Sequence, residues 1–419
     1  MNRTKRSPLY LMALTILIDF AGFGVVLPLL PFWAERQGAG ALGVGLILTI
    51  YALAQFIFIP VLGVLSDRYG RRPIIIASLL IEAFSLALSA LAGSLPMLFV
   101  ARFIGGLGAS NIGSAQAVVA DVTSVEKRAR GMGLIGAAIG LGFVVGPALG
   151  GVLAPLGPTL PFRVAMSIAL ANALLVLRFL PETRHIRATT EVSIPMPFTN
   201  HGRGVMLAER RQVLRYRAVA RLVVINLLFT LAFTAMEAVF PLFTQHSFGW
   251  TALQNGYIFT YVGISIVLMR GGLAGRLVKR CGERSLLIAG LLLLAAGLAL
   301  LSWSTNLALL LIALSIVSAG DGVVTPMVAT LLSFASPSGA QGETLGLAQG
   351  VAGLGRAVGP LAAGSIFALG GPGAPFFFGS ALVVLAALIA LPARSIKQGV
   401  PLMHSTPDAQ TVSTAQDRS

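Results

Sequence analysis

Six charged side chains lie inside long apolar segments of this sequence. They are Asp19, Glu82, Arg102, Glu237, Asp321 and Arg356. A charge in such a segment is costly and usually faces a water-filled cavity or an opposite charge. Carboxyl groups in such places can exchange protons or hold the cationic group of a ligand. The six residues therefore predict the binding or movement of protons or ions. A purely structural hydrogen bond or ion pair is the alternative for each of them.

The composition indicates what kind of element must position these charges. Hydrophobic residues make up 56% of the chain, charged residues only 11%, and the mean hydropathy is +0.87. Soluble proteins have about 25% charged residues, so a soluble fold is excluded. A run of roughly 20 apolar residues spans a bilayer as a helix, in which every backbone polar group is paired internally. Because the alternating pattern of a membrane barrel is absent, we predict an all-α integral membrane protein.

The apolar segments predict twelve transmembrane helices in two six-helix halves. They lie at about 9–31, 43–64, 73–92, 96–119, 131–155, 161–181, 219–244, 251–271, 284–303, 306–335, 344–369 and 374–393. The predicted divisions are an N-terminal half at 1–181, a cytoplasmic linker at 182–218, a C-terminal half at 219–395 and a disordered cytoplasmic tail at 396–419. We expect a short amphipathic helix in the linker near Glu209–Arg217.

The distribution of positive charge predicts the orientation. With the N-terminus inside, 23 Lys and Arg side chains fall in cytoplasmic segments and 2, Arg36 and Arg163, in outer loops. Cytoplasmic loops carry such an excess, so both termini are predicted to be cytoplasmic. The net charge of +15 is then explained by the orientation of the helices in the membrane and by contact with anionic lipid headgroups. No nucleic-acid partner is implied. We expect a multi-pass protein of the cell inner (plasma) membrane.

The two halves repeat each other in sequence. The stretch 140–147, GLGFVVGP, is echoed 213 residues later by 353–360, GLGRAVGP. A weaker copy of 63–72 appears at 271–280, where Gly275 is expected to take the position of Asp67 and the acid is lost. Two six-helix repeats with a site between them near the bilayer midplane are typical of membrane carriers.

The stretch 63–73 is a dense charge cluster between two apolar runs. Its notable residues are Gly63, Asp67, Arg68, Gly70, Arg71 and Arg72. Asp67 at a helix end can accept charge-assisted hydrogen bonds from an Arg or from backbone N–H groups, and glycines permit a tight turn. A plain stop-transfer turn is the alternative, but topology alone does not require the acid.

Four stretches together resemble a known family. They are 63–72, 19–31, Arg102 with Gly105, Gly106, Gly108 and Ala109, and the fifth-helix set Gly142, Gly146, Pro147, Gly150 and Gly151. Over 1–395 the chain resembles the major facilitator superfamily and, within it, the twelve-helix drug:proton antiporters that include the tetracycline exporters. The resemblance implies that 63–72 latches the cytoplasmic side, that Asp19 and Arg102 handle protons, and that the fifth-helix set favours export. Glycines four residues apart are by themselves common in membrane helices.

Structural alternatives remain for these motifs. Asp19 could make a structural hydrogen bond to another helix, and Arg102 could form a structural ion pair with Asp67 or with another helix. In the C-terminal half we expect Asp321 or Glu237 to pair with Arg356. Glu82 is interpreted as structural.

The sequence predicts a transporter and no enzyme. The four His residues have no metal-ligand spacing, no nucleotide-binding loop is present, and we expect no cofactor or metal. The lone Cys281 excludes an intrachain disulfide. We predict a monomer that exports small hydrophobic or cationic compounds, of multidrug or tetracycline type, in exchange for protons by alternating access. Such a protein would confer antibiotic resistance. The proton-coupling set is Asp19, Arg102, Glu237, Asp321 and Arg356.

Two alternatives stay open for the function. The chain could transport a physiological metabolite such as a sugar, a siderophore or a lipid. It could also be a membrane receptor or scaffold that transports nothing. The substrate itself is not readable from the residues, and tetracycline is one candidate among several.

Overall fold

The computed structural model describes residues 3–123, 125–183, 216–336 and 341–391, and within these ranges the chain is helical with short connections. Most of the predicted linker at 182–218, its expected helix near Glu209, and the tail at 396–419 lie outside the described residues. The predicted domain boundaries therefore stay predictions.

The N-terminal half contains six spans in ten helical pieces. They are α1 (Arg3–Val26), α2 (Leu30–Arg36), α3 (Ala41–Tyr69), α4 (Arg71–Ala90), α5 (Leu95–Gly108), η1 (Ala109–Asn111), α6 (Ile112–Val122), α7 (Val125–Leu153), η2 (Ala154–Leu156) and α8 (Leu160–Phe179). The fourth span is α5, η1 and α6 in succession, with a 3₁₀ turn in its middle.

The C-terminal half follows the same order. Its elements are α10 (Arg217–Phe248), α11 (Ala252–Leu268), η4 (Met269–Leu273), α12 (Ala274–Cys281), α13 (Glu283–Ser302), α14 (Leu307–Ala335), α15 (Gln341–Gly370) and α16 (Ala374–Ala390). Here the second span runs from Ala252 to Cys281 and includes η4, one turn of π-helix. It therefore ends ten residues beyond the predicted segment 251–271.

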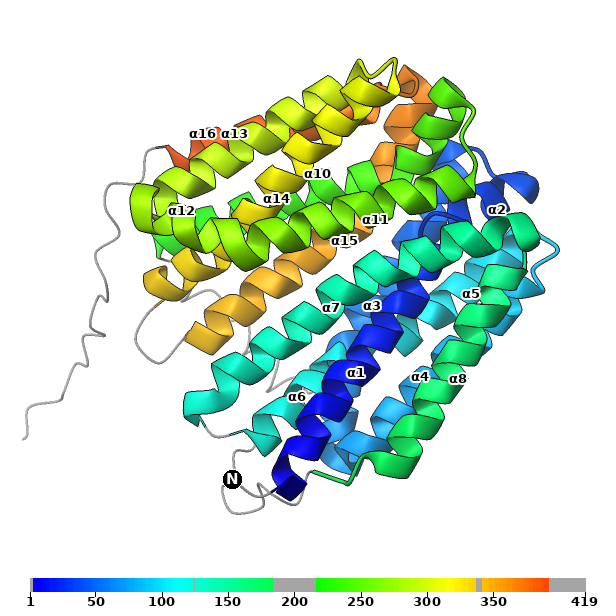
Figure 1. Ribbon diagram of the computed structural model, residues 1–419, viewed down its shortest axis with the longest axis vertical. Helices are drawn as coiled ribbons and strands as arrows, with labels where there is room; N and C mark the ends of the chain where they lie inside the picture. The colour runs from blue at the N-terminus through cyan, green and yellow to red at the C-terminus, as the bar shows by residue number, and fades with distance from the viewer. Residues whose placement is uncertain (1–2, 124, 184–215, 337–340, 392–419) are drawn as a thin grey trace, which may run out of the picture.

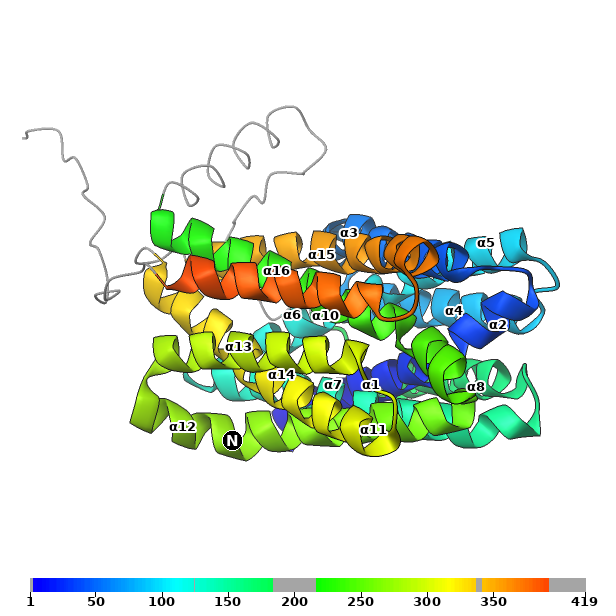
Figure 2. The same ribbon diagram turned by 90° about the horizontal axis from the view of Figure 1, so that it is seen from above.

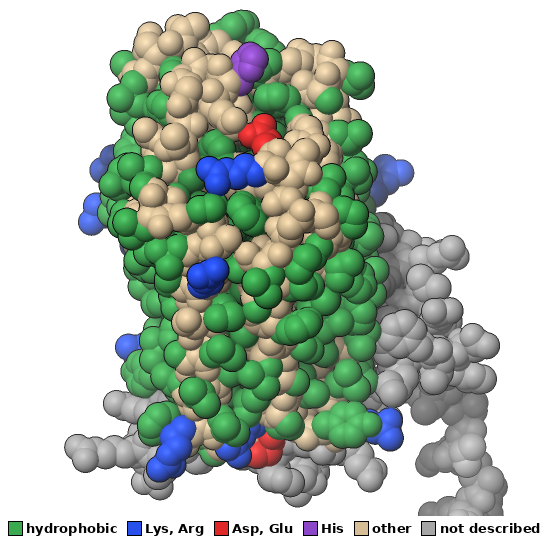
Figure 3. Space-filling view, turned by 90° about the vertical axis from the view of Figure 1, so that its right-hand side faces the viewer, with side chains coloured by type: hydrophobic (Ala, Val, Ile, Leu, Met, Phe, Trp, Pro, Cys, Tyr) green, Lys and Arg blue, Asp and Glu red, His purple; other side chains and the backbone are tan. Residues whose placement is uncertain are grey.

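The spans match a bilayer in length and surface. Eleven described helical stretches are long and apolar enough to cross a membrane, and α16, at 17 residues, is the twelfth. The face drawn in Figure 3 is largely apolar, and its few charged side chains lie apart from one another in the upper part, in the middle and along the lower end. Large side chains such as Leu174 and Leu268 are exposed on the outside of the bundle. The predicted twelve-helix, all-α membrane fold is confirmed.

The two halves are separate bundles that pack against each other (Figures 1 and 2). One apolar core is built almost entirely from α10–α16, and two smaller ones mainly from α1–α8. The halves meet through α3 against α15 and α7 against α11. Glycines make these contacts close: a Cβ on Gly45 would lie 2.4 Å from the carbonyl oxygen of Pro360, and one on Gly256 would lie 2.6 Å from that of Pro147.

The contact between the halves is tight at one end only. Gly45 lies near the start of α3, the helix that follows α2, and Gly256 lies near the start of α11. In Figure 1 the end of the bundle that carries α2 is opposite the chain's N-terminus. Toward the other end of α7 and α15, Gly133, Gly136 and Gly346 have no heavy atom of the described chain within 4 Å of a Cβ placed on them. The halves are thus in close contact at the α2 end, and these three glycines make no close contact toward the end near residues 63–73.

Candidate functional site

Asp19 lies in a buried polar cluster inside the N-terminal half. Its carboxyl group faces the carboxyl group of Glu82 on α4 and the side-chain amide of Asn111 in η1. Asp19 is 9% exposed and Glu82 7%. Two acids this close and this buried do not both carry a charge readily, because like charges repel strongly away from water.

Arg102 on α5 supplies the positive charge of this cluster. Its Nη2 donates to Ser89 Oγ at 2.8 Å, and Ser89 Oγ donates in turn to the carbonyl of Ser85 at 2.7 Å. The guanidinium also interacts electrostatically with Glu82 and with Tyr51 of α3. Arg102 is therefore held by Ser89 and lies within electrostatic reach of Glu82, a buried acid of its own half. The alternative that it pairs with Asp67 is wrong, because Asp67 is engaged elsewhere.

Several polar atoms of the cluster have spare hydrogen-bonding capacity. Within the described chain, Asp19 Oδ1, Glu82 Oε2, Arg102 Nε and both amide atoms of Asn111 have no hydrogen-bond partner. Unpaired buried polar atoms cost free energy, and in native proteins they often mark functional positions. A cluster with open donors and acceptors around a carboxyl pair can accept, hold and pass on a proton. Glu82, interpreted from the sequence as structural, is a member of this site.

Glycines of the fourth span bring the cluster together. A Cβ on Gly106 would lie 2.2 Å from the carbonyl oxygen of Tyr51, and one on Gly108 would lie 2.7 Å from the backbone nitrogen of Glu82. Only hydrogen in place of Cβ lets α5 approach α3 and α4 this closely. The pattern Gly105, Gly106 and Gly108 thus fixes the distance between Arg102 and the acids.

The fifth-helix set packs α7 against α1 and α11. A Cβ on Gly146 would lie 2.5 Å from the carbonyl oxygen of Ala21, and one on Gly150 would lie 2.3 Å from that of Val25. Gly142 approaches α1 at Leu17 in the same way, and Gly151 meets α11 at Gly256. The set therefore holds the helix that carries Asp19, and it continues into the contact between the halves.

The charge cluster at 63–73 forms a network between three helix ends. Asp67 Oδ1 lies 2.6 Å from Arg71 Nη1, and Arg71 Nε lies 3.3 Å from Asp121 Oδ2 at the end of α6. Gly70 has a φ of 109°, a left-handed conformation that only glycine adopts without strain. Arg68 lies over the ring of its neighbour Tyr69. Gly63 makes no close approach: no described atom lies within 4 Å of a Cβ placed on it.

Glu182, just after α8, caps the start of α4. Its carboxylate accepts the backbone N–H groups of Arg71 at 2.9 Å and Arg72 at 3.1 Å. A carboxylate at a helix N-terminus is stabilised by unpaired N–H groups and by the helix dipole. Arg72 reaches back in the other direction and donates from Nη2 to the carbonyl of Leu177 on α8. The loop is thus tied to the end of α8 and to the first residue of the predicted linker.

The second-half copy has a different register from the predicted one. Gly282, with a φ of 75°, separates α12 from α13 as Gly70 separates α3 from α4. Counting back from this turn places Lys279 at the position of Asp67 and Gly275 at that of Gly63, so the prediction for Gly275 is wrong. Arg284, like Arg72, donates to carbonyls at the end of the sixth span of its half, those of Ala390 and Leu391. The acid of the first copy is replaced by a base.

The charges of the C-terminal half form a second group. Asp321 Oδ2 accepts from Arg270 Nη2 at 2.7 Å, and the same nitrogen donates to Thr325 Oγ1 at 3.1 Å. Arg270 lies in the π-helical turn η4, a feature often found at functional sites. The expected pairing of Asp321 with Arg356 is therefore wrong. Arg356 is half-buried and forms no ion pair with the described residues.

Five residues that contribute to these groups were not singled out from the sequence. They are Tyr51, Asn111, Asp121, Glu182 and Arg270. Asp121 and Arg270 are charged residues at span ends and could have been noted. Glu182 directly follows the predicted span 161–181 and carries the same signal, whereas the roles of Tyr51 and Asn111 depend on contacts between helices.

Known proteins share this architecture. The family model described as "Major Facilitator Superfamily" matches residues 12–275 and 271–410. The tetracycline resistance protein, class C, of Escherichia coli is 32% identical over 384 residues, which cover 90% of this chain and 94% of that protein. Multidrug resistance protein 2 of Bacillus subtilis (strain 168) is 31% identical over 357 residues, covering 84% of this chain and 87% of that protein.

A solved structure of a human relative is also similar. The crystal structure of the human organic anion transporter MFSD10 (TETRAN) aligns with a TM-score of 0.69 at 28% identity, covering 93% of this chain and all of the other. A bundle of two six-helix halves with charged groups buried inside each is the structure of a membrane transporter. The chain belongs to the Major Facilitator Superfamily.

Proposed function

We propose that this transporter exports small hydrophobic or cationic compounds in exchange for protons. The observation that carries the proposal is the carboxyl pair of Asp19 and Glu82, buried beside Arg102. A proton on this pair neutralises a like-charge contact, and its release restores the repulsion, so occupancy by a proton can favour one conformation over another. Asp19 is the primary proton carrier, Arg102 holds the local charge, and the acids of the C-terminal half contribute to coupling.

Alternating access supplies the mechanism. With the predicted orientation, the closed α2 end faces outward and the end near residues 63–73 faces the cytoplasm. The described state then corresponds to a transporter open to the cytoplasm. When the cytoplasmic side closes, the network of Asp67, Arg71 and Asp121 would latch it. We further propose that the protein acts as a monomer in the inner (plasma) membrane with both termini in the cytoplasm.

The proposal draws support from two kinds of relative. The named tetracycline and multidrug resistance proteins are similar over most of their length. The test is transport in everted membrane vesicles with a preset pH gradient. Addition of tetracycline or cationic drugs is expected to dissipate the gradient and drive drug uptake in vesicles that contain the protein. No change in the gradient and no gradient-driven uptake across a broad panel would contradict the proposal.

Transport of an organic anion is the second candidate. The similarity to the human MFSD10 structure, whose name includes "organic anion transporter", favours it. So does Arg356, a half-buried cation without an ion pair in the described chain, on the helix that packs against α3. Competition by organic anions, and not by cationic drugs, in the same vesicle assay would favour this candidate and would point to a physiological metabolite.

A further inference from the structure

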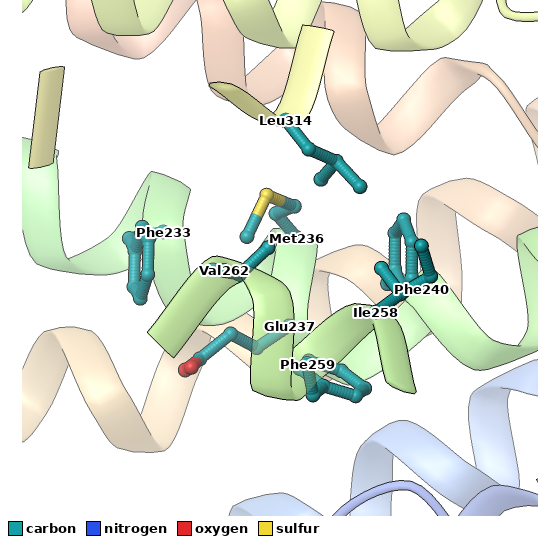
Figure 4. A pocket seen from close by; sticks show the side chains of 8 residues that line it. All are labelled: Phe233, Met236, Glu237, Phe240, Ile258, Phe259, Val262 and Leu314. Atoms are coloured by element: carbon teal, nitrogen blue, oxygen red, sulfur yellow. The ribbon is translucent and has the colours of Figure 1, made fainter. Parts of the chain in front are cut away.

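The C-terminal half contains two recesses of opposite charge. The first lies between α10, α11 and α14, and Glu237 is the single charged residue among those that line it (Figure 4). The second, which we call the basic recess, lies between α10, α13, α14 and α16. Its charged lining residues are two bases, Arg221 of α10 and Arg284 of α13. Within the described chain the basic recess is therefore lined by positive charge and by no acid.

The basic recess lies at the end of the bundle that also carries residues 63–73. Because successive spans run in opposite directions, the starts of α10 and α13 and the ends of α14 and α16 meet at this end. The remaining lining side chains are aliphatic, among them Leu222, Leu287 and Ile389. Outside the recess, Leu388 of α16 is 55% exposed and belongs to the apolar surface of the bundle. Positive charge at a span end thus adjoins a surface that faces lipid tails.

Both arginines have donor groups to spare. Arg284 Nη2 donates to the carbonyl groups of Ala390 and Leu391 at the end of α16, which holds the guanidinium in place. Its Nε is buried and has no hydrogen-bond partner in the described chain. Arg221 forms no ion pair there, and neither does Glu283, which precedes Arg284 in the sequence. Two guanidinium groups that face one recess without an acid repel each other, and an anion between them would offset that repulsion.

The N-terminal half has an anion at the corresponding helix start. There the carboxylate of Glu182 accepts two backbone N–H groups at the start of α4. The equivalent start of α13 follows Gly282, and no side chain of the described residues caps it. In the sequence, the residues LPET at 180–183 correspond to LPAR at 391–394, which places Ala393 in line with Glu182. The second half thus lacks this acid, and the N–H groups and positive dipole end of α13 can receive an anion from outside the chain.

We propose that the basic recess binds the phosphate group of an anionic membrane lipid. The inference is independent of the proposed substrate and coupling ion. Arg221 and Arg284 would supply the countercharge, and the acyl chains would lie along the apolar surface beside Leu388. The space that the centre of a water-sized group can occupy in the recess is about 30 Å³, enough for about two or three phosphate oxygens and too little for a whole lipid. A bound headgroup would join α10 to α13, as Glu182 joins the chain after α8 to α4.

Lipids that differ in headgroup charge test this assignment. Full-length protein purified in detergent would be titrated with dioleoylphosphatidylglycerol, which is anionic, and with dioleoylphosphatidylcholine, which has the same acyl chains and no net charge. Native mass spectrometry counts the lipids bound and gives the dissociation constant of each. We expect one phosphatidylglycerol to bind at least about tenfold more tightly than phosphatidylcholine, because two arginines contribute. A large excess of inorganic phosphate should not displace it, because phosphate has no acyl chains.

Variants locate the bound lipid. Arg221→Gln should weaken phosphatidylglycerol binding about fivefold, the effect expected for one arginine near a headgroup, and Arg221→Lys should retain most of the affinity. Arg276→Gln is the matched control, because it removes an exposed base of α12 at the same end that does not line the recess. It should bind the lipid as the wild type does. Thermal unfolding of each variant confirms that folded protein is compared.

Any of three results would overturn the inference. The wild type could bind the two lipids equally well, which would show that headgroup charge is not recognised. Arg221→Gln could weaken binding no more than Arg276→Gln does, which would assign the binding to general surface charge. Inorganic phosphate could displace the lipid, which would make free phosphate the ligand. Proton-coupled export in vesicles depends on Asp19 and Glu82, so its success or failure is decided separately from that of lipid binding.

Discussion

The carboxylate of Glu182 accepts the backbone N–H of Arg71 at 2.9 Å and that of Arg72 at 3.1 Å, which ties the end of one half's last helix to the start of α4. The two segments are more than a hundred residues apart in sequence. Gly70 permits this approach, because a Cβ there would lie 2.5 Å from Glu182 Oε2. Residues 63–73 are therefore held both by their own ion pairs and by the segment that leads into the linker.

Glu182→Ala should lower both stability and transport. The loss of a capping side chain typically costs about 0.5–2 kcal/mol, and here two N–H groups lose their acceptor. The measurement is thermal unfolding of the purified protein together with transport at matched expression. Glu182→Gln keeps one acceptor oxygen, so its unfolding temperature and its transport should lie between those of the wild type and those of Glu182→Ala. Unchanged unfolding temperature and transport in Glu182→Ala would show that the cap has no role.

Asp67→Asn should reduce transport and leave membrane insertion normal. The Asp67 side chain is 44% exposed, so its pair with Arg71 contributes at most about 1 kcal/mol, enough to shift a two-state equilibrium about fivefold. Gly275→Ala is the control in the second half, because no described atom lies within 4 Å of the added Cβ. Its effect should be smaller. Equal transport by Asp67→Asn and the wild type at matched expression would show that Asp67 does not help to hold the cytoplasmic side closed.

Gly106→Ala should disrupt the cluster around Asp19 without changing a charge. The added methyl group would lie 2.2 Å from the carbonyl oxygen of Tyr51, so α5 would have to move away from α3. Overpacking of this kind costs about 1–3 kcal/mol. Gly63→Ala, in a helix position with open space, should be neutral. The comparison uses folded yield and thermal unfolding, and similar values for the two variants would contradict the close packing described above.

Removal of Arg270 should destabilise the protein more than removal of its partner. The Asp321 side chain is 3% exposed and the Arg270 side chain 44%. Arg270→Gln leaves a buried acid without its cation, a loss that can reach about 3 kcal/mol, whereas in Asp321→Asn the Arg side chain can turn toward a more polar region. Thermal unfolding of the two single variants and the double variant gives the interaction free energy between the two side chains. Equal destabilisation by both single variants would be inconsistent with the observed burial.

The sequence predicted the fold and half of the proton cluster. Twelve apolar segments and the distribution of positive charge suffice for a two-bundle membrane fold, because helix length and backbone pairing leave few alternatives. Asp19 and Arg102 stood out as charges in apolar segments. That they share a cluster with Glu82 and Tyr51 depends on how α1, α3, α4 and α5 pack, which residue spacing along one helix does not reveal.

The errors have identifiable physical causes. The glycines at 271 and 272 imitate Gly63, but they lie in the π-helical turn η4, and the true counterpart of the first turn is Gly282. The sequence predicts an acidic partner for Arg356, because an unpaired cation in an apolar segment is unusual. Asp321, one of the two predicted partners, is paired instead with Arg270 from a neighbouring helix. Both outcomes depend on how the helices fold and pack against one another, which the residue pattern does not show.

We propose above that Asp19 carries the proton that drives export. This proposal is tested most directly by Asp19→Asn in everted vesicles with a pH-sensitive dye and a substrate that the wild type transports. The variant should still fold and bind the substrate, because Asn keeps the shape of Asp, but substrate addition should no longer dissipate the pH gradient. If Asp19→Asn moves protons with substrate at the wild-type rate, the carboxyl pair of Asp19 and Glu82 is not the coupling site.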